Sequence, residues 1–501
     1  MSLDFDELAD IQGNILRGYR HLHHVAYLFW AIEPGGVKEV RAFLAELADQ
    51  DPDHEACEFS VMSAEPWENK KRVHEAVNIA FTATGLRKLE WGERFERFTD
   101  FWQGMAARAP AYLRESEQSR QLWEPQLVNQ ADMLLTLYCD TVELLDTRVE
   151  ALERRASDAS LVKVYEQRAG PIDAGVAAPG AEPTFGEREH FGFRDGFSQP
   201  ALPVSHYGSG EGARGEGALL RPWSTGRRWR PLKLGEFLLG HEDEDEQVPG
   251  DADRESPHRN GTFMVWRKLA QDVDAFNKYL GKQPYPERTA AKLVGRWPDG
   301  TSLEKAPLAA PLHSHKRRPA NDFDYAGDGD GALCPLGAHV RRANPRAALG
   351  WGTERTRRHR IIRRGMPYQD GDECGLVFVC FNASINRQFE QIQGNWLADG
   401  DAFGLGGERD ALVGGAPPGT IAIQGGRGAP LQLLEPPPVP LVTPLGGYYL
   451  FAPGLTVLRR MGKGRGPDAP KPTTLLRVWG VLVGRGSRRR RRLDQRGGVD
   501  D

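Results

Sequence analysis

Four short apolar runs divide the first third of the chain. They are rich in β-branched and aromatic residues, which is typical of strands, and they lie at residues 24–32, 76–82, 133–139 and 161–167. Between the first two runs, and again between the last two, apolar residues recur at helical spacing: Val37, Val40, Leu44 and Leu47, then Val142, Leu145, Val149 and Leu152. This order, β-α-β-β-α-β with a mixed insertion at about 86–130, predicts a ferredoxin-like domain.

The second half of the chain repeats the same order. Strands are predicted at 262–268, 357–364, 374–381 and 446–452, with a helix at 385–397. Another helix is predicted after the first of these strands from the spacing of Leu269, Val273, Phe276 and Leu280, with Gly281 as its C-cap. The fold class predicted from this pattern is α+β, with two ferredoxin-like (split βαβ) domains and antiparallel sheets.

A stretch rich in glycine and proline at 169–186 predicts a linker between the two domains. We therefore expect an N-terminal domain at 1–180, an inter-domain segment at 181–230, a C-terminal domain at 231–484 and a disordered basic tail at 485–501. Ligand pockets often form between domains, so the segment that directly follows the linker is a candidate for function.

Charge and composition exclude several classes of protein. A net charge of −4 over 501 residues gives no basic footprint for nucleic acid. No apolar run reaches membrane-spanning length and no signal peptide is visible, so we expect a soluble cytoplasmic protein. Five cysteines without a CxxC pair favour reduced thiols. The acidic run at 241–255 is expected to be a solvated loop, with a divalent-cation site as the alternative; the arginine run at 488–492 is expected to be solvated or to bind an anionic surface.

Three side chains are candidates for chemistry. Asp195 lies on a turn between two glycines, where the backbone can approach a ligand, although an Asp there can equally hydrogen-bond its own turn. His339 lacks the partners of a zinc motif, yet one histidine suffices if a porphyrin supplies the other four ligands to an iron. Arg363 and its neighbour Arg364 follow an apolar strand, where an arginine needs an anion, with a salt bridge across the domain interface as the alternative.

Ten segments resemble, in order from residue 11 to about 460, the dye-decolorizing peroxidases. They are IQGNILRGY (11–19), NIAFTATGLRKL (78–89), EHFGFRDGFSQP (189–200), GEFLLGHE (235–242), RNGTFMVWRKLAQDV (259–273), AAKLVGRWPDG (290–300), CPLGAHVRRANPR (334–346), HRIIRRGMPY (359–368), FVCFNASINRQFEQIQGNWL (378–397) and GGYYLFAPGL (446–455). The length of the chain is similar to that of the longer bacterial-type members.

The resemblance implies a cofactor and its ligand. In this family one haem b per chain is held between a sheet and helices of two ferredoxin-like domains. His339 matches the proximal ligand of the haem iron. The family's carboxylate partner for that imidazole has two candidates here, Asp399 and Asp401.

The resemblance also implies residues on the opposite, distal side of the haem. The GxxDG motif matches at Asp195, which is thereby the expected acid–base residue, and the distal arginine matches Arg363 because it follows an Ile-Ile pair. Leu376 and Phe378 match apolar residues over the distal face. Asp195 is expected to accept a proton from one peroxide oxygen and return it to the other, while the fixed charge of Arg363 stabilises the developing negative charge.

The activity implied is that of a haem-dependent peroxidase. Such an enzyme reduces hydrogen peroxide to water and oxidises dyes, phenols or similar reductants by one-electron steps, with Mn²⁺ as a further candidate substrate. Two alternatives remain. One is a haem-binding or iron-releasing protein of the same fold; the other is an interaction module without haem, in which Asp195, His339 and Arg363 are structural. The presence of both Asp195 and Arg363 favours the enzyme.

Overall fold

The computed structural model describes residues 3, 5–19, 21–49, 58–65, 73–172, 188–196, 198–203, 218–220, 228–251, 253, 255–308, 321, 323–350, 353–415, 419–424 and 430–464. Most of the linker predicted at 169–186, the basic tail at 485–501 with its arginine run, and Cys57 lie outside these residues. None of the described helices is both long and apolar enough to span a membrane. The cysteines at positions 139, 334, 374 and 380 are free thiols.

The first half of the chain forms an antiparallel sheet with the strand order β4-β1-β3-β2. Its elements are β1 (His24–Ile32), α3 (Val37–Leu47), β2 (Glu75–Phe81), β3 (Met133–Cys139), α7 (Val142–Asp158) and β4 (Leu161–Ala169). Helix α7 begins where the Thr141 hydroxyl accepts a hydrogen bond from the backbone N–H of Leu144 at 3.2 Å. This topology is ferredoxin-like, so the prediction from the hydrophobic pattern is confirmed.

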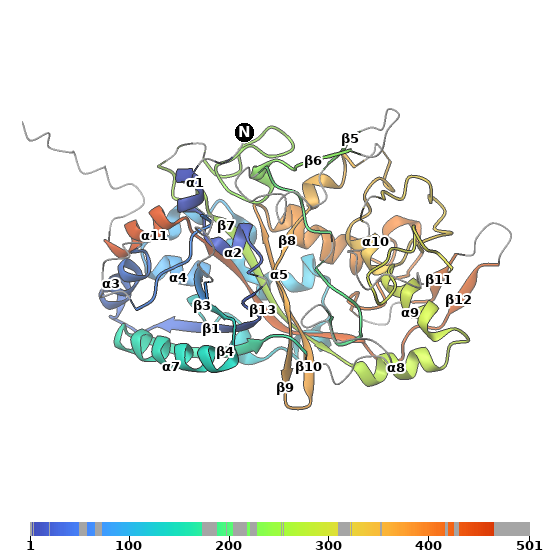
Figure 1. The fold of residues 1–501 in the computed structure, drawn as a ribbon, viewed down its shortest axis with the longest axis horizontal. Coiled ribbons are helices and arrows are strands. Elements are labelled where there is room, and N and C mark those ends of the chain that lie inside the picture. Colours follow the sequence, from blue (N-terminus) through green and yellow to red (C-terminus); the bar gives the residue numbers. More distant parts are fainter. Residues whose placement is uncertain are drawn as a thin grey trace, which may run out of the picture. The chain divides into compact units, whose positions relative to one another are not determined.

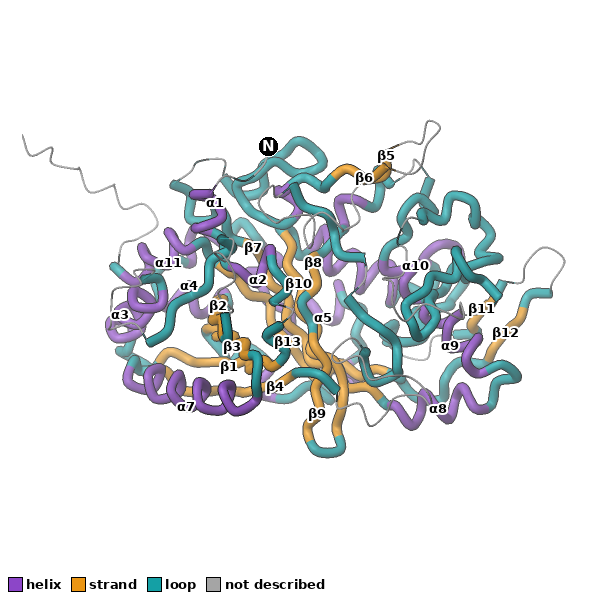
Figure 2. The backbone as a smooth tube through the Cα atoms, in the orientation of Figure 1, coloured by secondary structure: helices purple, strands orange, loops and turns teal. Residues whose placement is uncertain are grey.

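The second half forms the same topology, with the strand order β13-β7-β10-β8. Its elements are β7 (Thr262–Gln271), α8 (Val273–Gly281), β8 (Ile362–Arg363), β9 (Met366–Asp370), β10 (Glu373–Asn382), the π-helix η6 (Asn386–Leu397) and β13 (Val442–Ala452). β9 forms a hairpin with β10. Phe81 of β2 pairs with Phe451 of β13, so the two halves join in one nine-stranded sheet. Figure 2 shows β7, β10 and β13 side by side at the centre of this sheet.

The remaining described elements lie around this sheet. They are α1 (Phe5–Asp10), α2 (Gly13–Leu16), α4 (Ala83–Lys88), η1 (Gly92–Phe95), α5 (Thr99–Tyr112), α6 (Glu117–Arg120), η2 (Pro125–Leu127), β5 (Ala218–Leu220), β6 (Arg228–Arg230), η4 (Leu234–Glu236), α9 (Pro286–Val294), α10 (His339–Ala343), η5 (Arg357–His359), η7 (Ala402–Gly404), β11 (Ile421–Ile423), β12 (Gln432–Leu434) and α11 (Leu455–Gly462).

The sheet curls so that one face of each half lies inside. Tyr27 and Phe29 of β1 pack edge-on against Trp266 of β7, with ring centroids 5.8 and 4.9 Å apart. The outer edges of the two halves, at β4 and β9, also meet. There the backbone N–H of Gly170 donates to the carbonyl of Pro367 at 2.9 Å. Helices α3 and α7 cover the outer face of the first half, and Figure 1 shows α7 lying along β1 and β4.

The outer face of the second half positions the candidate site. Side chains alternate along β10, so Val377 and Val379 belong to the inner core shared with β1, while Leu376 and Phe378 point the other way. Phe378 packs against Phe389 of η6, with ring centroids 5.8 Å apart. A cavity therefore lies between this outer face and the helices η6, α9 and α10.

Several local predictions for the second half were wrong. Leu269 lies in β7 and not in the following helix, because α8 begins only after Asp272, whose carboxylate accepts the N–H of Ala275 at 2.8 Å. Gly281 is the last residue of α8 and Lys282 is its C-cap. In the segment 357–364 only Ile362–Arg363 is a strand, and the residues before it form the 3-10 turn η5.

Part of the acidic run at 241–255 is buried, although most of its described residues are partly or fully exposed, so the prediction of a solvated loop holds only in part. Asp243 and Glu244 are buried, as is Glu236 just before the run. The guanidinium of Arg387, on η6, lies 3.0 Å from a carboxylate oxygen of Glu236 and 2.9 Å from one of Asp243. Burial raises the pKa of Glu236 to about 7 in spite of this arginine. Among the described residues no group of three acidic, histidine or cysteine side chains could hold a cation, so the alternative of a cation site gains no support.

Candidate active site

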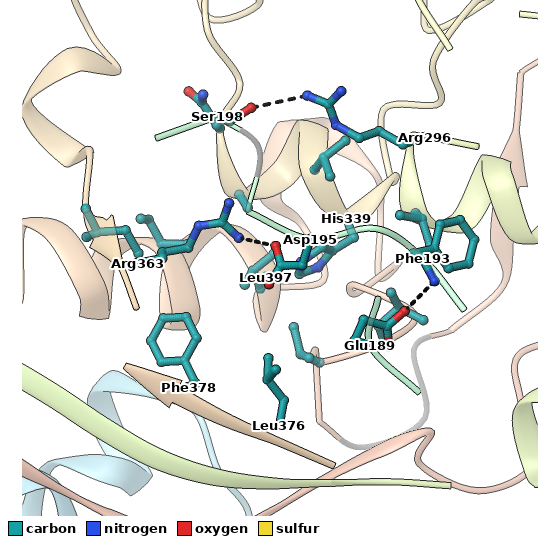
Figure 3. Close-up of a pocket in the computed structure, with 18 of the residues that line it drawn as sticks. Glu189, Phe193, Asp195, Ser198, Arg296, His339, Arg363, Leu376, Phe378 and Leu397 are labelled. Atoms are coloured by element: carbon teal, nitrogen blue, oxygen red, sulfur yellow. Dashed lines mark hydrogen bonds and ion pairs between the residues drawn. The ribbon is translucent and has the colours of Figure 1, made fainter. Parts of the chain in front are cut away.

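A cavity of about 280 Å³ opens over the outer face of β7 and β10. The exposed surface of its walls is mostly apolar, with charged and polar side chains interspersed. The apolar lining includes Leu269, Val294, Val340, Leu376, Phe378, Phe389, Ile392, Leu397, Leu412 and Val413. Asp195, His339 and Arg363, which the sequence brought forward from three separate segments, all line this one cavity (Figure 3). A mostly apolar cavity with a few convergent polar groups is the usual form of a cofactor site.

His339 is held by a buried carboxylate. Its Nδ1 lies 3.0 Å from Oδ2 of Asp410, whose other oxygen accepts the backbone N–H groups of Leu412 and Val413 at 3.0 and 2.8 Å. Burial opposes the charged imidazole, but the Asp410 carboxylate outweighs it and raises the pKa of His339. Because a carboxylate only accepts hydrogen bonds, Nδ1 carries the proton and Nε2 keeps its lone pair.

The helix that carries His339 is fixed by two buried arginines. His339 is the first residue of α10. Arg341 donates to a carboxylate oxygen of Asp328 at 2.8 Å and to the carbonyl of Cys334 at 2.7 Å. Arg342 donates to the carbonyl of Trp396 at 2.7 Å, at the end of η6. These bonds fix where the imidazole points.

Asp399 and Asp401, the predicted partners of His339, are not its partners. Asp399 pairs with Arg114 at 2.7 Å, and Asp401 accepts the backbone N–H of Gly406 at 3.3 Å within its own loop. The structure places Asp410 there instead. It lies 71 residues from His339 in a loop, and no periodicity or short spacing connects the two.

Asp195 and Arg363 meet at the cavity. The guanidinium Nη1 of Arg363 lies 3.3 Å from Oδ1 of Asp195, and the Asp195 side chain is 44% exposed (Figure 3). The same oxygen accepts the N–H of Gly196 at 2.6 Å, so Asp195 also makes the bond to its own turn that was the alternative interpretation. Both the turn and the pairing with arginine are therefore present.

The two neighbouring arginines differ in direction. Arg363, at the end of β8, lines the cavity. Arg364 turns away and donates to the carbonyls of Asn14, Ile15 and Arg17 at 2.9 to 3.0 Å, which satisfies acceptors at the C-terminal end of α2. Only Arg363 of the pair faces Asp195.

A cluster of arginines that sequence reasoning missed lies at Ser198. Arg296 and Arg346 donate to its hydroxyl at 3.2 and 3.3 Å, and Arg360 donates to its carbonyl at 2.7 Å. All three arginines line the cavity. Each stands in a segment that carries the resemblance, at 290–300, 334–346 and 359–368, but nothing in those segments indicates that the three side chains converge. Three guanidinium groups at one end of a cavity form a site for carboxylates.

These features fit a haem. The free lone pair of His339 Nε2 is a ligand for iron, and no described residue hydrogen-bonds that nitrogen. The apolar walls suit a flat macrocycle, and the arginine cluster at Ser198 suits its propionates.

Comparison with known proteins agrees with this geometry. The model of the DyP dimeric alpha+beta barrel domain matches residues 10–170, and that of the Dyp-type peroxidase, C-terminal, matches residues 240–405. The multifunctional dye peroxidase DyP2 of Amycolatopsis sp. is 32% identical over 68% of this chain and 73% of its own. The dye-decolorizing peroxidase msp1 of Mycetinis scorodonius is 27% identical over 90% of this chain and 87% of its own.

A solved structure extends the likeness to three dimensions. The structure of DyP2 from Amycolatopsis sp. superposes with a TM-score of 0.70 at 26% identity and covers 91% of this chain and 98% of its own. The resemblance found in the sequence is thus confirmed by domain models, by relatives and by the fold. This chain, with its two ferredoxin-like halves and the cavity lined by His339, belongs to the dye-decolorizing peroxidase family and is a haem peroxidase.

Proposed function

We propose that this chain reduces hydrogen peroxide to water and takes the two electrons, one at a time, from dyes, phenols or similar reductants. The relatives named above are dye peroxidases, which supports the class of reductant. The observation that carries the proposal is the Asp195–Arg363 pair, 3.3 Å apart, in the same cavity as His339.

The proposal assigns one haem b to the cavity. His339 Nε2 would hold the iron, with the imidazole oriented and made more basic by Asp410. Arg296, Arg346 and Arg360 would pair with the propionates. When bound, the haem supplies the iron that binds peroxide and stores the oxidising equivalents.

Asp195 is proposed as the acid–base residue. Its carboxylate can accept a proton from one oxygen of hydrogen peroxide and return it to the other, which leaves as water. Arg363 cannot lose its own proton, so it contributes a constant positive charge to the oxygen that becomes negative as the O–O bond breaks. Leu376 and Phe378 keep this side of the cavity apolar, which strengthens both interactions.

The alternative of a haem-binding or iron-releasing protein is less well supported. Neither binding a haem nor releasing its iron requires splitting peroxide, and so neither requires a carboxylate and a guanidinium paired over the cavity. Mn²⁺ stays a candidate reductant beside the dyes and phenols.

An absorption spectrum and steady-state assays test the proposed function. The chain, supplied with haem, should show a Soret band and should oxidise a phenol and an anthraquinone dye only when hydrogen peroxide is present. The same assays with Mn²⁺ in place of the dye or phenol show whether Mn²⁺ is also oxidised. A haem-loaded protein with no turnover of any reductant would favour the carrier, and a colourless protein would contradict the proposed cofactor.

A further inference from the structure

The turn that carries Asp195 lies between two glycines whose backbone conformation other residues rarely adopt. Gly192 and Gly196, on either side of it, have φ values of +88° and +82°, a region that favours glycine. Glycine backbones have many accessible conformations, and the Asp195 side chain is 44% exposed. A proton carrier must nevertheless stay within hydrogen-bond reach of its substrate. Besides the bond to the Gly196 N–H within the turn, contacts made by the residues before and after it therefore bear on the position of Asp195.

Glu189 closes the loop that precedes Asp195. One carboxylate oxygen accepts the backbone N–H of Phe193 at 2.9 Å (Figure 3), and the other accepts the N–H of Phe191 at 2.9 Å and the side-chain amide of Gln271 at 2.6 Å. The backbone of Glu189 also donates to the carbonyl of Phe193 at 3.0 Å. Residues 189–193 are thus folded around this one carboxylate, and Gln271 ties it to the end of β7.

Gln199 fixes the segment that follows Asp195. Its side-chain amide donates to the carbonyl of Arg363 at 3.0 Å and accepts the backbone N–H of Arg363 at 3.1 Å. A primary amide that donates to the carbonyl and accepts the N–H of one residue pairs with β8 as the backbone of a neighbouring strand would. This pairing holds the Asp195 segment against the residue whose guanidinium faces Asp195.

We propose that Glu189 and Gln199 are positioning residues, which hold the carboxylate of Asp195 over the cavity and beside the guanidinium of Arg363. The proposal rests on the proposed function, since it takes Asp195 as the proton carrier. Glu189 fixes the loop before Asp195 and Gln199 fixes it after, so Asp195 is held from both sides. Neither residue is assigned a proton-transfer step of its own.

Each residue can be replaced by one of similar size that cannot make these bonds. In Glu189→Gln one oxygen becomes an N–H₂ group, so a donor faces a donor and at least one of the three bonds is lost. In Gln199→Leu both bonds to Arg363 are lost. A misplacement of about 1 Å at a catalytic group can cost about 100-fold in rate. We expect each variant to lower the rate of reaction with peroxide by about 10- to 100-fold.

The test is a double-mutant cycle on the full-length, haem-loaded protein. The rate constant for the spectral change of the haem after mixing with hydrogen peroxide is measured by stopped flow. Glu189→Gln and Gln199→Leu are each made in the unchanged chain and in a chain that carries Asp195→Asn. Asp253→Asn and Gln369→Leu are matched controls at exposed positions elsewhere: Asp253 accepts a backbone N–H at 3.0 Å in a loop, and Gln369 of β9 donates to a carbonyl at 2.7 Å.

The expected result is non-additive. Each positioning variant should slow the reaction in the unchanged chain, should cause no further loss when Asp195→Asn is present, and should leave the haem content unchanged. An equal loss in both backgrounds, or no loss in the unchanged chain, would overturn the positioning role while leaving the proposed function intact. If Asp195→Asn alone leaves the rate unchanged, the acid–base role of Asp195 fails, and the positioning role fails with it. If Gln199→Leu does not fold, Gln199→Glu replaces it. The new carboxylate still accepts the N–H of Arg363 but turns a second acceptor toward its carbonyl, and it should slow the reaction only in the chain that keeps Asp195.

Discussion

His339 donates from Nδ1 to the Oδ2 of Asp410 across 3.0 Å, although the two residues are 71 positions apart in the sequence. Asp410 is completely enclosed, and its other oxygen is occupied by two backbone N–H groups. Burial alone would raise the pKa of Asp410, but the imidazole and these donors lower it, so the carboxylate stays ionised. A full negative charge therefore acts on the imidazole.

Removing that charge should change the reduction potential of the haem. Asp410→Asn leaves an oxygen that can still accept from Nδ1, but the imidazole becomes a weaker donor to the iron and stabilises the ferric state less. We expect the Fe(III)/Fe(II) potential to rise, measured by spectroelectrochemical titration. Asp399→Asn is the matched control, because Asp399 pairs with Arg114 and not with the histidine. Equal shifts in the two variants would contradict the assignment.

His339 should be required for stable haem binding. His339→Ala removes the proposed ligand, and only apolar contacts and the arginine cluster at Ser198 remain to hold the macrocycle. The haem-to-protein ratio after gel filtration should fall to near zero, while His74→Ala, at an exposed histidine, should leave it unchanged. Full haem occupancy in His339→Ala would show that another residue binds the iron.

The two neighbouring arginines should give opposite phenotypes. Arg363→Leu should lower the rate constant with hydrogen peroxide by about 100- to 1000-fold, the usual effect of losing one charge-stabilising donor, with little effect on unfolding. Arg364→Leu should leave that rate close to normal and lower the free energy of unfolding by about 2 kcal/mol, because carbonyls of α2 lose a charged donor. Stopped-flow kinetics and denaturant titration of both variants check the contrast. A slow peroxide reaction in Arg364→Leu alone would reverse the assignment.

His258 should make the fold sensitive to acid. Its ring is buried, and Arg97 donates to Nδ1 at 3.1 Å, so Nε2 carries the proton and donates to the carbonyl of Arg94 at 2.9 Å. Burial, with a smaller contribution from Arg97, lowers the pKa of His258 to about 4. Because the unfolded chain takes up this proton near pH 6.5 and the folded chain does not, stability is lost as the pH falls from 6.5 toward 4.

The size of the acid effect follows from the lowered pKa of His258. The loss amounts to about 3 kcal/mol of unfolding free energy between pH 6.5 and pH 4. His258→Gln removes the titrating group, so denaturant titrations at pH 7 and pH 4.5 should differ less in this variant than in the unchanged chain. An identical pH dependence in both proteins would mean that other groups cause the acid sensitivity.

The hydrophobic pattern was sufficient for the sheets and insufficient for the loops. Strands β1 and β3 match their predicted bounds, because a run of apolar β-branched and aromatic residues is readable wherever a strand is buried on both faces. β9 was missed, since MPYQD carries a proline and two polar residues and is fixed by its hairpin with β10. The joining of the two halves through β2 and β13 is a tertiary pairing with no signal in either segment.

Of the candidate site, the sequence supplied the residues that stand in motifs. Asp195, His339 and Arg363 were found through segments of recognisable sequence, and the structure brings all three to one cavity. Asp410 lies outside those segments, 71 residues from His339, and was not found. The arginines at Ser198 stand within such segments, but their convergence on Ser198 across 98 to 162 residues has no signal in the sequence. The burial of Asp243 and Glu244 within the acidic run was missed for the same reason, since Arg387, which pairs with Asp243, lies 144 residues away on η6.

The alternation of side chains along β10 has a consequence for altering this enzyme. Since Leu376 and Phe378 project away from Val377 and Val379, a substitution at either of the first two changes the space over the haem site and leaves the packing against β1 in place. Pocket shape and fold stability can therefore be varied separately by point changes. Inserting or deleting a single residue within β10 would turn the cavity-facing side chains toward the core and the core-facing side chains toward the cavity. The shape of the pocket and the stability of the fold would then be lost together.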